Sequence, residues 1–234
     1  MIRYRERTVR KIIDTLCAAN CGFPRRYKAA ILKLWFIMDI PDTPRRIWTV
    51  QNKNLWTDLD LFMAIFFIVR IDMFVKIQRK CASGGQRRLI MAQPSLTFCL
   101  DVVTGTAIRD NMEYLSALVR WRYNPRPEEL ASGEPIFGVP ISDIGSLQYE
   151  GYGSGRSTGR KLRRPDDLIL REAVRRKLKM NDMYRRIFLH SQPEKYNLCE
   201  RPGIPWDREA RLKVEADGVD IHPHGVLRLD KWPV

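Results

Sequence analysis

The stretch between Thr57 and Lys80 constrains the fold of this chain more than any other. Its centre reads LFMAIFFIV, from Leu61 to Val69, and is apolar on nearly every side of a helix. The run is shorter than the roughly 18 apolar residues that a membrane-spanning helix needs. Other groups must therefore cover it all round. Either this helix is the spine of the chain's own core, or a partner or a membrane edge covers part of it through Phe62, Phe66, Phe67 and Val69.

Both ends of this helix carry clear signals. Thr57 and Asp60 resemble a capping box, in which two side chains bind free backbone N–H groups reciprocally. The helix dipole favours acidic residues in the first turn and basic residues in the last, and the chain has both: Asp58, Asp60, Lys76, Arg79 and Lys80. With Gly84 and Gly85 as the stop, we expect a helix over about residues 57–80.

Similar patterns place the other elements. Apolar residues at helical spacing predict helices over residues 2–16, 24–38, 108–119 and 165–178, and the second of these is expected to stop at Pro41 and Pro44. Between Leu96 and Val102 apolar and polar residues alternate, which predicts a short strand. The expected fold class is mainly α: an irregular helical domain with long Pro/Gly-rich extended segments and at most one or two short strands.

These elements divide the chain into four regions. Residues 1–123 form a helical domain with the apolar central helix. Residues 124–164 form an extended Pro/Gly-rich connector, because they hold many turn formers and little periodicity. Residues 165–192 form basic amphipathic helices, and residues 193–234 an extended C-terminal tail.

The positive charge of the chain is unevenly distributed. The formal net charge is +14. Residues 1–50 hold 11 basic and 4 acidic side chains, residues 151–200 hold 13 and 6, and residues 101–150 reverse the balance with 4 and 8. Two basic segments around a more neutral middle suit docking onto nucleic acid, anionic lipid or an acidic protein.

The densest basic segment is GYGSGRSTGRKLRRPDD, residues 151–167. A phosphate-binding loop of the Walker type needs Gly, four residues, Gly, Lys and then Ser or Thr, and no register of this segment has that spacing. A dinucleotide-binding loop needs a preceding buried strand, which is missing. The remaining interpretation is a flexible glycine hinge that carries cations, either as a solvated linker or as a contact for phosphates or acidic side chains. The candidate contacts are Arg156, Arg160, Lys161, Arg163, Arg164, Arg175, Arg176, Arg185 and Arg186.

Little in the chain points to chemistry at a metal or cofactor. The five cysteines form no close-packed framework, which favours free, buried thiols in a reducing compartment. His222 and His224 have no neighbouring Cys or carboxylate cluster to complete a metal site. We therefore expect no catalytic residue, no cofactor and no metal, and do not expect an enzyme. The Arg-rich N-terminus, MIRYRERTVRKII, is compatible with an organellar transit segment or with an uncleaved basic helix.

One stretch resembles a known family. Residues 166–207 hold an acidic pair, a Glu-Ala-x-Arg-Arg helix, an Arg-rich second helix with an aromatic residue, and a later Pro and Trp. The positions that carry the pattern are Asp166, Asp167, Glu172, Ala173, Arg175, Arg176, Tyr184, Arg185, Arg186, Pro205 and Trp206. This resembles the small matrix-side helical subunit of the mitochondrial cytochrome bc1 complex. The resemblance implies a helical accessory subunit of a respiratory assembly.

The sequence thus favours a non-catalytic structural or accessory subunit of a large mitochondrial membrane complex, of the respiratory chain or ATP synthase. Its expected place is the inner membrane, on the matrix side, with other subunits of the assembly as partners and anionic lipid such as cardiolipin as a further candidate. We do not expect a free monomer. The alternative is a mitochondrial ribosomal protein whose basic segments bind rRNA.

Overall fold

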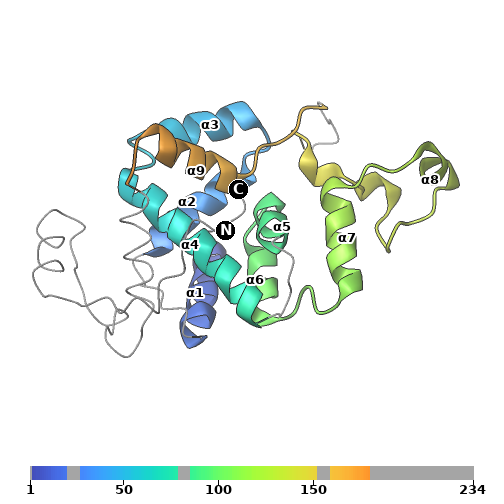
Figure 1. Ribbon diagram of the computed structural model, residues 1–234, viewed down its shortest axis with the longest axis horizontal. Coiled ribbons are helices and arrows are strands. Elements are labelled where there is room, and N and C mark those ends of the chain that lie inside the picture. Colours follow the sequence, from blue (N-terminus) through green and yellow to red (C-terminus); the bar gives the residue numbers. More distant parts are fainter. Residues whose placement is uncertain (1, 20–26, 79–84, 152–158, 180–234) are drawn as a thin grey trace, which may run out of the picture.

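The computed structural model describes residues 2–19, 27–78, 85–151 and 159–179 (Figure 1). In these residues the chain is mainly helical and has no strand, which confirms the expected fold class. The helices are α1 Ile2–Ala18, α2 Lys28–Asp39, α3 Thr43–Gln51, α4 Asp58–Gln78, α5 Gln86–Ala92, α6 Thr97–Thr104, α7 Asn111–Arg122, α8 Pro127–Ser132 and α9 Pro165–Arg175, with short 3-10 turns η2 Ile141–Asp143 and η3 Ser146–Gln148.

Helix α4 is the spine of the core. Its apolar side chains pack against α2 and α9 and, over smaller areas, against α1, α5 and α6. Phe62, Phe66 and Phe67 are at most 5% exposed, and Val69 is partly buried against the same core. The interpretation of these four residues as contacts for a partner or a membrane edge is therefore corrected: helices distant in sequence cover α4 from within the chain.

The N-terminus of α4 has the expected capping box. The Asp60 carboxylate accepts hydrogen bonds from the Thr57 backbone N–H at 2.9 Å and hydroxyl at 2.7 Å, and the Thr57 hydroxyl accepts one from the Asp60 N–H at 3.2 Å. Lys33 of α2 adds an ion pair to the same carboxylate at 2.7 Å. Burial acts to raise the pKa of Asp60, but the hydrogen bonds from Lys33 and Thr57 outweigh it and hold this pKa below its ordinary value.

Helix α1 is built into the core. Val9, Ile12, Ile13 and Leu16 are at most 3% exposed, and the helix packs against α6, α2 and α4. Arg3 and Arg10 of this helix are exposed, whereas Arg5 forms an ion pair with Asp39 of α2 at 2.6 Å. Removal of α1 would expose the apolar faces of α2 and α6.

Two local predictions were wrong. The expected strand at residues 96–102 lies in helix α6 and its N-cap Leu96. The buried residues Leu96, Cys99 and Val102 repeat every three residues, as on one face of a helix. Gly105 ends α6 with a φ of 83°. The sequence pattern also predicts no helix at α3, because Pro44 is expected to stop the preceding helix. Pro44 instead lies in the first turn of α3, where a missing N–H costs nothing, and the side chain of Asp42 caps that turn by accepting from the Arg45 N–H at 2.8 Å.

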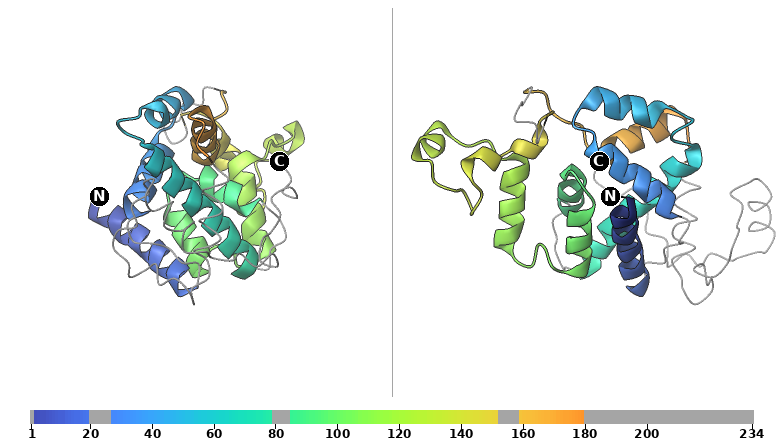
Figure 2. Two further views of the ribbon diagram at one scale, coloured as in Figure 1. Left: turned by 60° about the vertical axis from the view of Figure 1, so that its left-hand side comes forward. Right: turned by 180° about the vertical axis from the view of Figure 1, so that it is seen from behind.

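Residues 106–148 form a side arm that extends from the body (Figures 1 and 2). It consists of α7, α8 and the 3-10 turns, and it meets the body where α7 packs against α5. The Gly145 N–H donates to the Val119 carbonyl at 3.0 Å, which folds the end of the arm back onto α7. Short helices thus occupy part of the region that was expected to be extended.

Candidate cationic docking surface

Helices α3 and α9 lie side by side and run in the same direction, at the same upper end of the molecule in all views (Figures 1 and 2). Near their N-termini, Arg46 of α3 donates to the Arg163 carbonyl at 2.7 Å. Near their C-termini, Arg176 donates to the Val50 carbonyl at 3.1 Å. Residues more than 100 positions apart in the chain therefore form one continuous surface.

The segment 159–164, which we call the strap, enters this surface beside the N-terminus of α3. The Glu150 N–H donates to the Arg160 carbonyl and the Leu162 N–H to the Gln148 carbonyl, both at 2.8 Å. This antiparallel pairing joins residues 148–150 to the strap. The Arg163 N–H donates to the Thr43 hydroxyl at 3.1 Å, which fixes the strap to α3.

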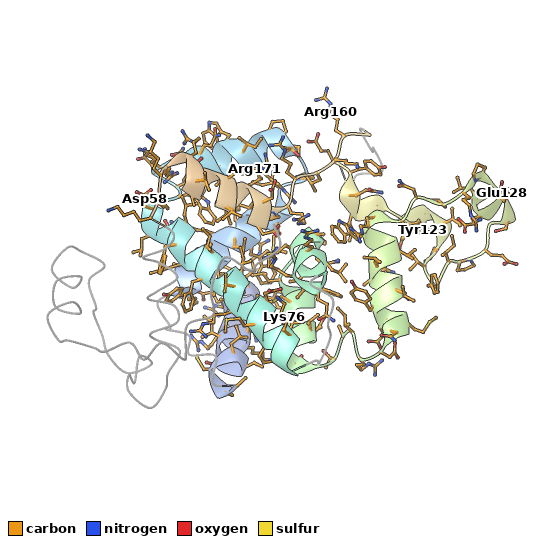
Figure 3. All side chains as sticks on the ribbon, viewed as in Figure 1. Asp58, Lys76, Tyr123, Glu128, Arg160 and Arg171 are labelled. Carbon is orange, nitrogen blue, oxygen red and sulfur yellow. The ribbon has the colours of Figure 1, made fainter. Side chains whose placement is uncertain are left out.

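The strap leaves three cations exposed: Arg160, Lys161 and Arg163. Figure 3 shows Arg160 and Arg171 on the same upper side of the molecule. Arg171 is 64% exposed and forms an ion pair with Asp167 one turn earlier, at 3.0 Å. Residues 42–53 and 159–179 together hold 12 basic and 4 acidic side chains, a large part of the net charge of +14.

The same two helices also expose apolar side chains. Trp48 of α3 is 64% exposed, and Leu170 and Val174 of α9 are 46% and 64% exposed. The α3–α9 face is the name we give to the exposed side of these two helices and the strap. The sequence alone does not mark its apolar residues as a site. The i,i+4 spacing of Leu170 and Val174 shows that they share a face of α9, but the position of α3, which carries Trp48, beside α9 depends on the packing of two distant helices.

The adjacent residues Arg175 and Arg176 lie in different environments. The side chain of Arg175 is 55% exposed and binds Glu172 at 2.7 Å. The side chain of Arg176 is 4% exposed and donates to the Trp56 and Val50 carbonyls and to the carboxylates of Asp58 and Glu172. Arg176 is therefore corrected from a partner contact to an internal link between α9 and the α3–α4 connection.

Glu172 is the charged centre of this link and is 3% exposed. Its burial acts to raise the pKa, but the hydrogen bonds and charges of Arg175 and Arg176 outweigh burial and lower the pKa of Glu172. The carboxylate therefore stays ionised and balances two guanidinium groups.

Arg164 also has internal partners. It binds Asp166 at 2.9 Å and lies 6.0 Å from the centre of the Trp121 ring, which connects the strap to α7. Of the other expected contacts, Arg156, Arg185 and Arg186 lie outside the described residues, as do Tyr184, Pro205, Trp206, His222 and His224.

Other kinds of site have little support in the described part of the chain. Arg10, Ile13, Asp14 and Lys28 line a cavity of about 380 Å³ between α1 and the start of α2, and Lys28 is already paired with Glu6 at 2.9 Å. Within residues 2–19, 27–78, 85–151 and 159–179, no group of three or more His, Cys, Asp or Glu side chains could hold a metal ion. None of the helices in those ranges has the length and apolarity to cross a membrane.

The two cysteines in the described ranges lie in helices α1 and α6. Cys99 is buried in α6, and burial raises the pKa of its thiol. Cys17 is half-buried against the core. Both therefore behave as small apolar side chains.

Comparison with known proteins does not assign this surface. No protein-family model, curated protein or solved structure matches the chain.

Proposed function

We propose that this chain is a non-catalytic accessory subunit of a large mitochondrial membrane complex, of the respiratory chain or ATP synthase, and that the α3–α9 face docks it onto an anionic surface of that assembly. The observation that carries the proposal is the exposure of Trp48, Leu170 and Val174 among the cations of this face. Acidic subunits and anionic lipid such as cardiolipin both offer the complementary charge.

The combination of charge and apolar area favours this kind of partner. Cations attract anionic headgroups or carboxylates, at roughly 1 kcal/mol for each Lys or Arg near an anionic membrane. Apolar side chains add affinity only where the partner can also bury them, as a membrane interface or a protein surface does. Tryptophan suits such an interface because its ring is apolar and its N–H is polar.

The mitochondrial part of the proposal rests on the resemblance of residues 166–207 to the bc1 subunit. Helix α9 holds the first part of that pattern, including Asp166, Glu172 and Arg175. In this structure Glu172 and Arg176 serve internal packing. The proposal therefore uses the outer side of α9, where Leu170, Arg171 and Val174 lie.

A mitochondrial ribosomal protein is the second candidate. The strap presents Arg160, Lys161 and Arg163 to solvent next to α3, and closely spaced cations suit the phosphates of rRNA. RNA binding of this type uses mainly charge, so it would depend steeply on salt and little on Trp48.

Binding to vesicles and to RNA separates the two candidates. We expect the full chain to bind phosphatidylcholine vesicles that contain cardiolipin and to bind pure phosphatidylcholine much more weakly. Trp48→Ser and Arg171→Gln should each weaken binding by about fivefold. The matched control is Arg109→Gln, because Arg109 is 67% exposed and also has an i,i+4 carboxylate partner, Glu113, but lies on the side arm.

Two results would count against the membrane assembly. One is tight binding to structured RNA with an affinity that falls by orders of magnitude between low and moderate salt, combined with no binding to vesicles. The other is sedimentation of the native protein with ribosomal particles and not with detergent-extracted membrane complexes.

A further inference from the structure

The side arm contains a turn whose sequence does not suit its backbone. Ile136 and Val139 exchange two backbone hydrogen bonds of 3.0 Å, so Phe137 and Gly138 form a two-residue hairpin turn. Their φ angles are 49° and 74°, which is the type I′ geometry. Asn-Gly and Asp-Gly are favoured there, because a bulky side chain at positive φ is strained.

Phe137 gains little inside the chain to offset this strain. The residue is 45% exposed, and its carbonyl accepts a hydrogen bond from Ser116 of α7 at 2.6 Å. This bond fixes the turn against α7. Met112 lies one helical turn before Ser116 on the same face of α7 and is 56% exposed. A strained, solvent-exposed aromatic residue on a turn that is held against a helix with an exposed apolar side chain is typical of a contact surface.

The outer part of the arm is also acidic. Residues 127–143 hold four acidic and no basic side chains: Glu128, Glu129, Glu134 and Asp143. Glu129 binds Tyr123 and Arg126, and Asp143 lies 3.9 Å from Arg120. Leu130 of α8 is 50% exposed among these carboxylates, and Figure 3 shows Glu128 at the outer end of the arm.

We infer that the outer part of the side arm docks onto the α3–α9 face of a second copy of this chain. The two surfaces are complementary in kind. One has exposed Met112, Leu130 and Phe137 with acidic neighbours, and the other has exposed Trp48, Leu170 and Val174 with basic neighbours. Opposite charges orient the encounter, and the apolar centres supply buried area.

The positions of the two surfaces require a second molecule. The α3–α9 face lies at the upper end of the body, whereas the outer part of the arm extends sideways beyond α7 (Figure 1). An arm on one copy and a face on the next form a heterologous contact, so the pair keeps one free arm and one free face. Such a contact either closes a ring or adds further copies as the concentration rises.

Sedimentation of the purified full chain, at increasing concentration and low salt, tests this inference. We expect the mean mass of the wild type to rise beyond that of a dimer and to fall in high salt. Phe137→Asn removes the exposed aromatic ring of the turn and introduces a residue that favours the turn. Trp48→Ser removes the exposed tryptophan of the α3–α9 face. Each variant alone should lose self-association by at least tenfold. Phe36→Ser is the matched control, because Phe36 is 53% exposed on α2, outside both surfaces.

An equimolar mixture of the two variants gives the decisive result. The Phe137→Asn chain keeps an intact face and the Trp48→Ser chain keeps an intact arm, so the mixture should form a one-to-one dimer and nothing larger. A wild type that stays monomeric at every soluble concentration overturns the inference. So does a mixture that stays monomeric while the wild type associates, because an intact arm and an intact face would then not be sufficient for the contact.

This inference does not depend on the proposed function. At concentrations too low for self-association, Phe137→Asn should leave binding to cardiolipin vesicles unchanged, since Phe137 lies outside the α3–α9 face. A wild type that self-associates but does not bind cardiolipin vesicles would refute only the proposed function. A wild type that binds the vesicles but does not self-associate would refute only the contact between copies.

Discussion

Arg176 provides the sharpest test of how the α3–α9 surface is held together. The substitution Arg176→Met keeps most of the side-chain volume and removes the guanidinium group. It deletes the hydrogen bonds to the carbonyls of Trp56 at 2.7 Å and Val50 at 3.1 Å and the ion pair with Glu172 at 2.5 Å. Asp58 also loses its ion pair, but its side chain is 64% exposed and water replaces the lost partner.

The expected loss of stability follows from these contacts. Each buried carbonyl that loses its partner costs about 1 kcal/mol. Breaking a buried ion pair costs about 3–5 kcal/mol when the remaining charge has no other partner. Glu172 still binds Arg175, so we assign about 1 kcal/mol to the loss of its ion pair with Arg176. The sum is about 3 kcal/mol, which for a chain of this size lowers Tm by about 6–12 °C.

Thermal unfolding followed by circular dichroism at the helical band measures this loss. Arg175→Met is the matched control, because Arg175 binds the same carboxylate, that of Glu172, from an exposed position. The Tm of this variant should stay close to that of the wild type. Equal losses in the two variants would show that Arg176 does not link the helices as described. A loss for Arg175→Met larger than that for Arg176→Met would refute the reasoning altogether.

Four further predictions concern the fold. The folded protein lowers the pKa of Asp60, so Asp60 contributes fully to stability above its unfolded pKa of about 4. This contribution is lost as the pH falls through the lower folded pKa, so the stability of Asp60→Asn should fall less steeply with acid than that of the wild type. Lys177, at a φ of 56°, occupies the left-handed position after α9, so Lys177→Gly should raise the unfolding free energy by about 1 kcal/mol in urea titration. Phe137→Asn should also stabilise the chain by about 1 kcal/mol in the same assay, and a decrease would contradict the strain argument. Ile12→Ala should cost about 3 kcal/mol because Ile12 is fully buried, whereas Ile2→Ala, at a 78% exposed position, should change Tm little.

Features that depend on neighbours in sequence were predicted well. The capping box of Thr57 and Asp60 involves residues three apart, and the burial of α1 follows from helical spacing in the same stretch. The predicted strand from Leu96 to Val102 was wrong because the pattern of these seven residues fits both a strand and a helix. Helix α3 was not predicted because a proline can either end a helix or lie in its first turn, and only the cap by Asp42 shows that Pro44 lies in a first turn.

The candidate surface was only partly predictable for a different reason. The cations of the strap are close in sequence, so Arg160, Lys161 and Arg163 stand out as candidate contacts, and the structure shows them exposed. The role of Trp48 depends on the packing of α3 beside α9, which no local pattern reveals. Arg176 differs from Arg175 because position 176 faces inward, one turn after the buried Glu172, and this periodicity could have indicated its internal role.

The contacts between α9 and the α3–α4 region also affect how fast the chain can fold. Arg176 binds carbonyls that lie 120 and 126 positions earlier in the chain, and α1 packs against α6, which follows it by about 80 residues. Helical proteins with mostly local contacts fold rapidly, whereas distant contacts must first overcome the entropy of closing a long loop. During vectorial synthesis, α1 emerges first but has to wait for α6, and α3 has to wait for α9. We therefore expect slow folding for a helical chain, with apolar helix faces exposed to chaperones until residue 176 has been synthesised.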